Sequence, residues 1–153
     1  MRRIGAGLVV VLIAASLSVR AGKESGAPKP VRMSKAQIAG AIFEDYKPIV
    51  TRHENERGAY KTEDVEAFLS SDQHFDAGMY RSGPNRFEIT EPYGVDEFMY
   101  FLKGGVTLTS SDGTALKIRA GDAVVIPKEW TGVWETDGYT KIYVIYSADK
   151  PIE

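Results

Sequence analysis

The sequence predicts an all-β protein, a sandwich or barrel preceded by short helices, on three observations. Short apolar and aromatic runs alternate with turn residues from Phe75 to Tyr146. The turns recur at fairly regular spacing, which favours antiparallel strands over strand-helix-strand units. Twelve of the 16 aromatic residues fall in this segment, where a small barrel needs bulky side chains to fill its interior.

The strands are placed by the turn residues between them. Ser82-Gly83-Pro84-Asn85, Lys103-Gly104-Gly105 and Ser110-Ser111-Asp112-Gly113 each read as a turn, the last as a hairpin. Gly104 and Gly121 fall at tight turns where a side chain would crowd the backbone, and Pro127 ends a strand. The predicted strands cover residues 77–81, 86–91, 97–102, 106–109, 116–119, 123–126, 131–135 and 140–146.

Residues 1–21 have the layout of a secretory signal peptide. Arg2 and Arg3 form a positive start, residues 4–17 carry no charge, and Val19 and Ala21 suit the small positions before a cleavage site. The apolar run is shorter than the ~20 residues that a membrane-spanning helix needs. We therefore expect a secreted or periplasmic protein with no stable membrane anchor after cleavage. The alternative is an uncleaved anchor helix.

Residues 22–74 are expected to form a linker and an N-terminal extension with short helices. Ser34 and Gln37 have the spacing of a capping box, and the apolar residues behind them predict a helix over 35–46 that ends before Pro48.

The second half of this extension is predicted as a loop and another helix. Residues 53–61 are polar and read as the loop. Thr62 could cap the second helix, which would bury Val65, Phe68 and Leu69.

Composition excludes several classes of protein. The formal net charge is −2 and the pI about 5.8, so the chain lacks the basic excess of nucleic-acid binding proteins, and no nucleic-acid partner is expected. It contains no cysteine, which excludes a disulfide scaffold. The length of 153 residues suits one domain.

Two short motifs resemble those of the cupin superfamily. Glu97 precedes Gly104 by seven positions, and Gly121 precedes Pro127 by six. The string GDAVVIPKEWTGVWET, followed by KIYVIY, is similar to single-domain cupins related to ureidoglycine aminohydrolase and to the ethanolamine-utilisation cupin. The resemblance implies a single jelly-roll β-barrel over residues 75–147, with a tail at 148–153, and a homodimer as the usual assembly.

The metal-binding histidines that the resemblance implies are missing. The usual His-x-His pair aligns with Glu91 and Tyr93, and the later histidine aligns with Gly132; of the four usual ligand positions only Glu97 keeps its type. The chain's two histidines, His53 and His74, lie outside the motifs. Because transition metals generally need imidazole or thiolate ligands, we expect no such metal and no cofactor. An oxygen-only site for a hard cation at Glu91, Tyr93 and Glu97 is the alternative.

A small-molecule pocket is the remaining prediction for the barrel interior. If position 132 faces inward, the period of two turns Trp134 inward too, and Glu97 shares a face with Met99 and Phe101. Aromatic walls with a few polar groups are typical of small-molecule sites. Burial against Trp134 would favour the neutral form of Glu97 and suit it to acid or base work. The candidate site comprises Glu97 as the catalytic residue, with Tyr80, Glu91, Tyr93, Trp134 and Lys141 as ligand-binding residues.

Three functional hypotheses remain open. In the first, an exported cupin binds a polar small molecule in its barrel and uses Glu97 as an acid or base without a metal. In the second, the chain is a non-catalytic binding or dimeric interaction module. In the third, it is a metal-dependent hydrolase resembling (S)-ureidoglycine aminohydrolase, with non-histidine ligands. The sequence leaves open whether the protein is an enzyme.

Overall fold

The computed structural model describes residues 27–152 except 28 and 56. The predicted signal peptide therefore lies outside the described residues. Within them, no helix is both long enough and apolar enough to cross a membrane.

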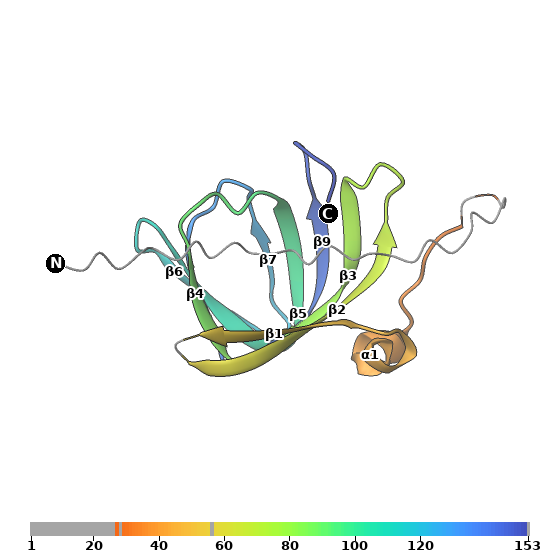
Figure 1. Ribbon diagram of the computed structural model, residues 1–153, viewed down its shortest axis with the longest axis horizontal. Coiled ribbons are helices and arrows are strands. Elements are labelled where there is room, and N and C mark those ends of the chain that lie inside the picture. Colours follow the sequence, from red (N-terminus) through yellow and green to blue (C-terminus); the bar gives the residue numbers. More distant parts are fainter. Residues whose placement is uncertain (1–26, 28, 56, 153) are drawn as a thin grey trace.

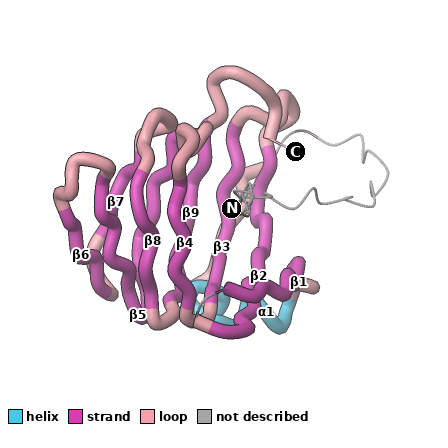
Figure 2. Tube along the Cα trace, turned by 60° about the vertical axis from the view of Figure 1, so that its left-hand side comes forward, coloured by secondary structure: helices cyan, strands magenta, loops and turns pink. Residues whose placement is uncertain are grey.

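Among the described residues, nine antiparallel strands form the fold, as the sequence predicted for an all-β protein. Figures 1 and 2 show the strands curving into a nearly closed barrel, with the helical segment against β2 at one end. The order along the sheet is β1-β2-β3-β9-β5-β8-β4, and β6 and β7 pair with β5. The strands are β1 Ile49–Asn55, β2 Gly58–Leu69, β3 Phe75–Ser82, β4 Asn85–Ile89, β5 Asp96–Ser110, β6 Ala115–Arg119, β7 Ala123–Ile126, β8 Gly132–Thr136 and β9 Tyr139–Tyr146.

β5 is one long strand, not the two short ones predicted on either side of residues 103–105. Its first half pairs with β7 and β9, and its second half with β6 and β8. The register shifts between Phe101 and Lys103, and Gly104 follows with φ +66°. The strand bends here without ending, because a β-bulge and a left-handed glycine redirect it.

A cluster of buried apolar side chains fills part of the barrel interior. Met99 and Phe101 on β5 are fully buried, and Trp134 on β8 is 2% exposed. The residues that complete this cluster are Val106, Leu108, Ile118, Ile126 and Tyr139. Burial of each large apolar side chain stabilises the fold by roughly 1.5–3 kcal/mol. The inward direction predicted for Trp134, and the shared buried face of Glu97, Met99 and Phe101, are confirmed.

The predicted N-terminal helix is confirmed and covers the outer face of the sheet. It runs through η1 (Gln37–Ala41) and α1 (Ile42–Asp45) and ends at Tyr46. Its capping box forms: the Ser34 N–H donates to Gln37 Oε1 at 2.8 Å and the Gln37 N–H donates to Ser34 Oγ at 3.2 Å. Ile42 and Phe43 of α1 belong to a second buried cluster, which also contains Val65 and Met79 of the sheet.

The second predicted helix, capped by Thr62, and the loop at 53–61 are wrong. These residues form parts of β1 and β2. The register of β2 against β3 shifts between Glu66 and Phe68, so the apolar residues of β2 depart from strict alternation and imitate helical spacing. The outer-face residue Val65 is also buried, because α1 covers it. Strands therefore begin at Ile49, inside the segment assigned to the N-terminal extension.

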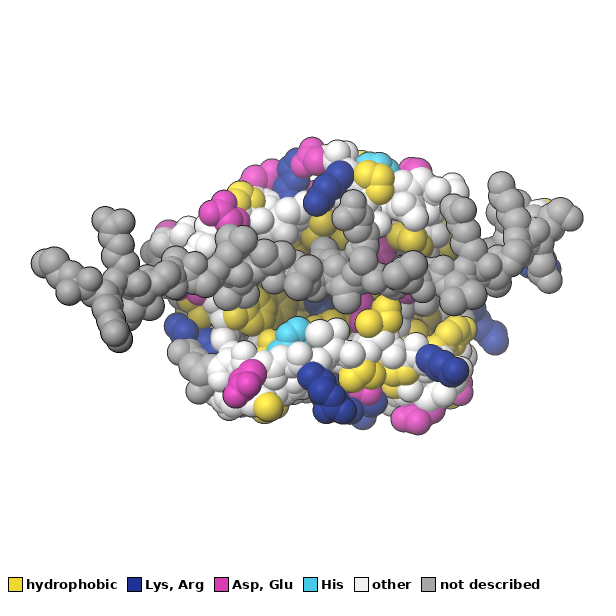
Figure 3. Space-filling view, in the orientation of Figure 1, with side chains coloured by type: hydrophobic (Ala, Val, Ile, Leu, Met, Phe, Trp, Pro, Cys, Tyr) yellow, Lys and Arg dark blue, Asp and Glu magenta, His cyan; other side chains and the backbone are white. Residues whose placement is uncertain are grey.

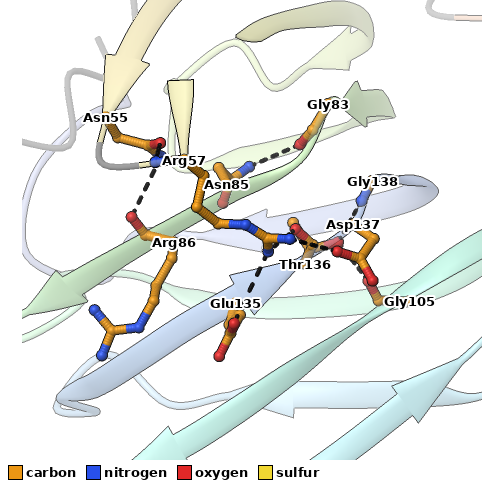
Figure 4. Close-up of polar contacts among 10 residues, drawn as sticks. All are labelled: Asn55, Arg57, Gly83, Asn85, Arg86, Gly105, Glu135, Thr136, Asp137 and Gly138. Carbon is orange, nitrogen blue, oxygen red and sulfur yellow. Dashed lines mark hydrogen bonds and ion pairs between the residues drawn. The ribbon is translucent and has the colours of Figure 1, made fainter. Parts of the chain in front are cut away.

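The β1–β2 turn is fastened to the opposite wall of the barrel. Arg57 donates from Nη1 to the Thr136 carbonyl at 2.9 Å and from Nη2 to Asp137 Oδ1 at 2.6 Å. Asn55 Nδ2 donates to the Arg86 carbonyl at 3.3 Å. Figure 4 shows these side chains reaching from the hairpin toward β4 and β8. The contacts close the barrel between strands at opposite ends of the sheet order.

Candidate functional site

The site is built where β5 and β9 run side by side. Phe101 of β5 pairs with Lys141 of β9, and Lys141 pairs with Tyr80 of β3. Paired residues of antiparallel strands share a face, so Lys141 and Tyr80 lie on the face that also carries Glu97. The sheet register, fixed by this buried aromatic interior, thus brings three predicted site residues together.

Tyr93 reaches the same interior from the β4–β5 loop. Its N–H donates to the Trp130 carbonyl at 3.0 Å, and the Gly94 N–H donates to the Lys128 carbonyl at 2.8 Å. Gly94 has φ +91°, a conformation that favours glycine. The loop is thereby fixed against the β7–β8 connection, with the Tyr93 hydroxyl turned toward Glu97.

Glu97 accepts hydrogen bonds from buried Lys141 and from partly buried Tyr93. Lys141 Nζ donates to Glu97 Oε1 at 2.5 Å, and the Tyr93 hydroxyl donates to Glu97 Oε2 at 2.5 Å. The Glu97 and Lys141 side chains are 3% and 6% exposed. Lys141 Nζ also lies 3.0 Å from Met99 Sδ. Two such donors suit an ionised carboxylate. The sequence-based expectation of a neutral Glu97 considered only burial against Trp134 and did not take the Lys141 ammonium into account.

Aromatic rings surround the Lys141 ammonium. Nζ lies 5.4 Å from the ring centroid of Tyr80, 5.5 Å from Trp134 and 5.8 Å from Tyr139. Such distances allow cation–π attraction, which strengthens where water is excluded. Sequence reasoning missed Tyr139, although its place two residues before Lys141 on a strand puts it on the same face.

Burial keeps the hydroxyls of this site protonated. Desolvation, followed by the Glu97 charge and the hydrogen bond to it, raises the pKa of Tyr93 well above its ordinary value. Desolvation also raises the pKa of Tyr80 and that of Tyr139. The indole Nε1 of Trp134 is buried and has no acceptor among the described residues. The site can therefore donate hydrogen bonds from neutral groups.

Glu91 does not join this cluster. It is exposed in the loop after β4, whereas the other predicted site residues Tyr80, Tyr93, Glu97, Trp134 and Lys141 converge on the interior. The neighbouring Pro92 is exposed as well. The alternation that served the strands could not place residues of this irregular loop.

Surface cavities lie outside the Glu97–Lys141 pair in the part of the chain that the structure describes. One of about 340 Å³ is lined by Tyr139 together with Lys61 and Arg81, and one of about 490 Å³ extends from Gly104 and Gly138 toward Lys117. Neither is lined by Glu97 or Lys141, but Tyr139, which lines the first cavity, has its ring centroid 5.8 Å from Lys141 Nζ. Seen as in Figure 1, hydrophobic side chains gather along the opening between the strand walls (Figure 3).

A comparison with protein families matches the segment that contains Glu97 and the motif glycines. The family described as the EutQ-like cupin domain matches residues 69–143. The chain belongs to the cupin superfamily. The resemblance expected from the two sequence motifs is therefore confirmed.

Solved structures of other cupins share the fold at low identity. A protein of unknown function of the DUF861 family from Pseudomonas syringae pv. tomato is 20% identical with a TM-score of 0.53 over 63% of this chain. This cupin covers 44% of that protein's length. The Clostridium difficile EutQ protein is 23% identical with a TM-score of 0.50, over 59% of this chain and 71% of the other.

A third structure covers more of both chains. The putative ethanolamine utilisation protein from Salmonella typhimurium is 18% identical with a TM-score of 0.50, over 67% of this chain and 98% of the other. Comparison with curated proteins gives no match. At these identities the likeness supports the fold and carries no activity over to this cupin.

The residues of this cupin do not fit the metal centre common in the superfamily. Both Glu97 oxygens accept bonds from Lys141 and Tyr93. A Cβ at Gly132, where a histidine would align, would lie 2.2 Å from the Thr109 carbonyl oxygen, so a side chain there requires a backbone shift. Among the described residues, no three His, Asp or Glu side chains are grouped to hold a metal ion.

Proposed function

We propose that this cupin is exported, binds a polar small molecule inside its barrel, and uses Glu97 as a proton-transfer group without a metal. The observation that carries the proposal is the buried hydrogen-bonded chain Tyr93–Glu97–Lys141. Export rests on the leader-like residues 1–21.

A buried ion pair costs stability, which is why its presence favours a functional role. Desolvating two charges costs several kcal/mol per ion, and an apolar pair of similar volume is often as stable or more so. Here the pair lies among aromatic rings, beside an indole N–H that has no acceptor in the part of the chain that the structure describes. Convergent polar groups in an apolar interior are the usual composition of a small-molecule site, and perturbed titratable groups cluster at such sites.

Glu97 is the group best placed to move a proton. Its carboxylate is held between an ammonium and a phenol, so a ligand that displaces either donor meets an oriented base. Lys141 would then act as a counter-ion to negative charge on the ligand, and Trp134 Nε1 as a free hydrogen-bond donor. These roles fit a ligand with acceptor oxygens, such as a carboxylate or a ureide.

Thermal-shift measurements with acetate, allantoin and glucose test the proposal. A ligand at 100 times its Kd stabilises the protein by about 2.7 kcal/mol. We expect at least one compound to raise the melting temperature of the wild type and to lose this effect in Glu97→Gln. Glu88→Gln, at an exposed position on β4, is the matched control and should keep the shift. No shift with any of the three classes would contradict the proposal.

The second candidate function is a homodimeric interaction module. It is favoured by exposed aromatic and aliphatic side chains on the outer face of the sheet. Phe98 pairs with Val125 and Val144, and Phe75 pairs with Tyr146. The exposed fractions of Phe75, Phe98, Tyr100, Val125 and Tyr146 range from 38% to 63%. Contiguous apolar surface of this kind marks interaction sites.

A further inference from the structure

A second cluster of titratable groups lies on the inner face of the barrel, apart from Glu97 and Lys141. The Tyr143 hydroxyl of β9 lies 3.0 Å from Asp64 Oδ1 of β2 and 3.4 Å from Asp76 Oδ2 of β3. Asp76 is 7% exposed and Tyr143 is 3% exposed. Three neighbouring strands thus bring two carboxyl groups to one phenol.

A single phenol proton serves two carboxyl groups in this cluster. A phenol has one proton, which it can donate to one carboxylate. With its proton directed to Asp64 at 3.0 Å, the phenol donates at most weakly to Asp76 at 3.4 Å, whereas a protonated Asp76 would be able to donate to the phenol oxygen. Burial keeps the phenol itself neutral, since desolvation raises the pKa of Tyr143 far above its ordinary range.

Asp76 is the better candidate for the protonated group. Its Oδ1 is buried and has no partner among the described residues. An orphaned oxygen costs far more free energy on a carboxylate than on a neutral acid. Desolvation, with the charges of Glu66 and Asp64, raises the pKa of Asp76 to about 7. Desolvation raises that of Asp64 to about 6, against the opposing effects of Tyr143 and Lys141.

The charges that face the pair come from three strands. Glu66 on β2 and Glu97 on β5 favour the protonated form of Asp64, and Lys141 on β9 opposes it. Desolvation, and to a smaller extent the Asp64 charge, raises the pKa of the Tyr80 phenol on β3, which is therefore neutral. The carboxyl groups of Asp64, Glu66, Asp76 and Glu97 therefore repel one another near the Lys141 ammonium, and a shared proton relieves part of this repulsion.

We propose that Asp64 and Asp76 hold one proton between them through Tyr143 near neutral pH, and that this proton can be given to a molecule in the barrel. Asp76, Ile145 and Glu97 occupy one row of the register on β3, β9 and β5. Two strand spacings separate Asp76 from Glu97 by roughly 10 Å between backbones. The interior then offers a neutral acid on one side of β9 and a carboxylate base on the other, which is the pairing that acid–base chemistry requires.

The shared proton is tested by ¹³C NMR titration of the aspartate carboxyl carbons in the whole protein, without any ligand. We expect two carboxyl groups to titrate near pH 6 and 7. Asp76→Asn should remove the upper midpoint and lower that of Asp64, while Tyr143→Phe should raise the Asp64 midpoint because a donor to its carboxylate is lost. Asp45→Asn, on the exposed helix end, should change neither. Midpoints near 4 for both residues would overturn the proposal.

The stability of the protein should report the same proton. Both folded-state pKa values lie above the ordinary value of 3.8, so folding takes up protons. The stabilisation is complete below about pH 4 and is lost as the pH rises through 6 and 7. The melting temperature of the wild type should fall over this range more steeply than that of Asp76→Asn. Equal slopes for the two proteins would contradict proton sharing.

Donation to a guest molecule is tested with diazoacetamide at pH 6.5. A carboxylic acid gives its proton to the diazo carbon, and the resulting carboxylate oxygen bonds to that carbon as N₂ leaves. Ionised carboxylates lack the proton and do not react. We expect an ester on Asp64 or Asp76 by peptide mapping, none on the exposed Asp45, and loss of the Asp76 ester in Asp76→Asn. An unlabelled pair would overturn the donor role.

This inference rests on the proposed function only in its use of a barrel ligand. The titration and the labelling need no natural ligand. If no compound shifts the melting temperature but the titration and the labelling give the expected results, the proposed function is rejected and the shared proton is not.

Discussion

At the scale of single residues, Lys141 determines what the barrel interior can do. Its ammonium pairs with Glu97 at 2.5 Å and lies among three aromatic rings. A metal ion in other cupins would compensate a ligand carboxylate; here a side chain of the protein does so. The consequence is that the two residues should depend on each other for stability.

Removal of Lys141 should be strongly destabilising. Lys141→Met leaves Glu97 buried without its counter-charge, and breaking a buried pair costs about 3–5 kcal/mol. The double variant Lys141→Met/Glu97→Gln should recover part of this loss, because no charge is then left unpaired. Urea unfolding measures both. Lys117→Met, at an exposed position on β6, should change stability little. A loss in Lys141→Met no greater than in Lys117→Met would show that the pair is not buried.

At the scale of elements, β5 organises the molecule because it takes part in both walls. The bend that allows this is at Gly104, where a Cβ would lie 2.0 Å from the Gly138 carbonyl oxygen. Gly121 also has a positive φ, of +93°, but nothing lies within 4 Å of its Cβ position. At Gly104 the predicted crowding is correct, but the predicted turn is wrong because the residue lies within β5. At Gly121 the predicted turn is correct, but the predicted crowding is wrong.

These two glycines form a matched pair of substitutions. Gly121→Ala should cost about 1–3 kcal/mol, the range for a residue held in an unfavourable backbone conformation. Gly104→Ala should cost more, since the methyl group must also displace the β8–β9 turn. Chemical denaturation of both variants checks the order. A smaller loss for Gly104→Ala than for Gly121→Ala would mean that the two segments are not in close contact.

The N-terminal helix offers a smaller test. Ser34→Ala removes the side-chain acceptor of the capping box and should cost about 1 kcal/mol. Ser71→Ala, in the exposed β2–β3 turn, is the control and should be near neutral. An unchanged midpoint for Ser34→Ala would indicate that the helix adds nothing to the stability of the barrel.

Sequence reasoning predicted correctly the features that depend on residues close together in the chain, and it missed those that depend on contacts between distant strands. Period-two alternation and turn residues placed the strands after Phe75, except that β5 was predicted as two strands, and the capping box placed the first helix. The bulge in β2 hid a strand behind helical spacing. The fastening of Arg57 to β8 and the Asp64–Tyr143–Asp76 cluster depend on register between distant strands. Lys141 was predicted as a residue of the barrel pocket, but its ion pair with Glu97 was not, because that pair depends on the register between β5 and β9.

At the scale of the whole molecule, the helix covers only part of the outer sheet face. Phe98 and Tyr100 remain 43% and 38% exposed. In the proposed interaction module, a second copy of the chain covers this exposed part of the sheet.

We expect a dimer that Phe98→Lys disrupts. A charge at the centre of an apolar interface is left desolvated on association. Light scattering after size-exclusion chromatography should give a dimer for the wild type and a monomer for Phe98→Lys. Leu116→Lys, on the other side of the barrel on β6 and also exposed, should stay dimeric. A monomeric wild type would reject the interaction module.

The most direct test of a ligand-binding barrel is the indole N–H region of a ¹⁵N NMR spectrum. The chain has two tryptophans. Trp134 Nε1 has no acceptor among the described residues, whereas Trp130 Nε1 donates to Ser110 Oγ at 3.0 Å and serves as an internal reference. A compound that binds beside Glu97 should shift the Trp134 signal, and Glu97→Gln should abolish that shift. A binding compound that leaves the Trp134 signal in place would contradict a site inside the barrel.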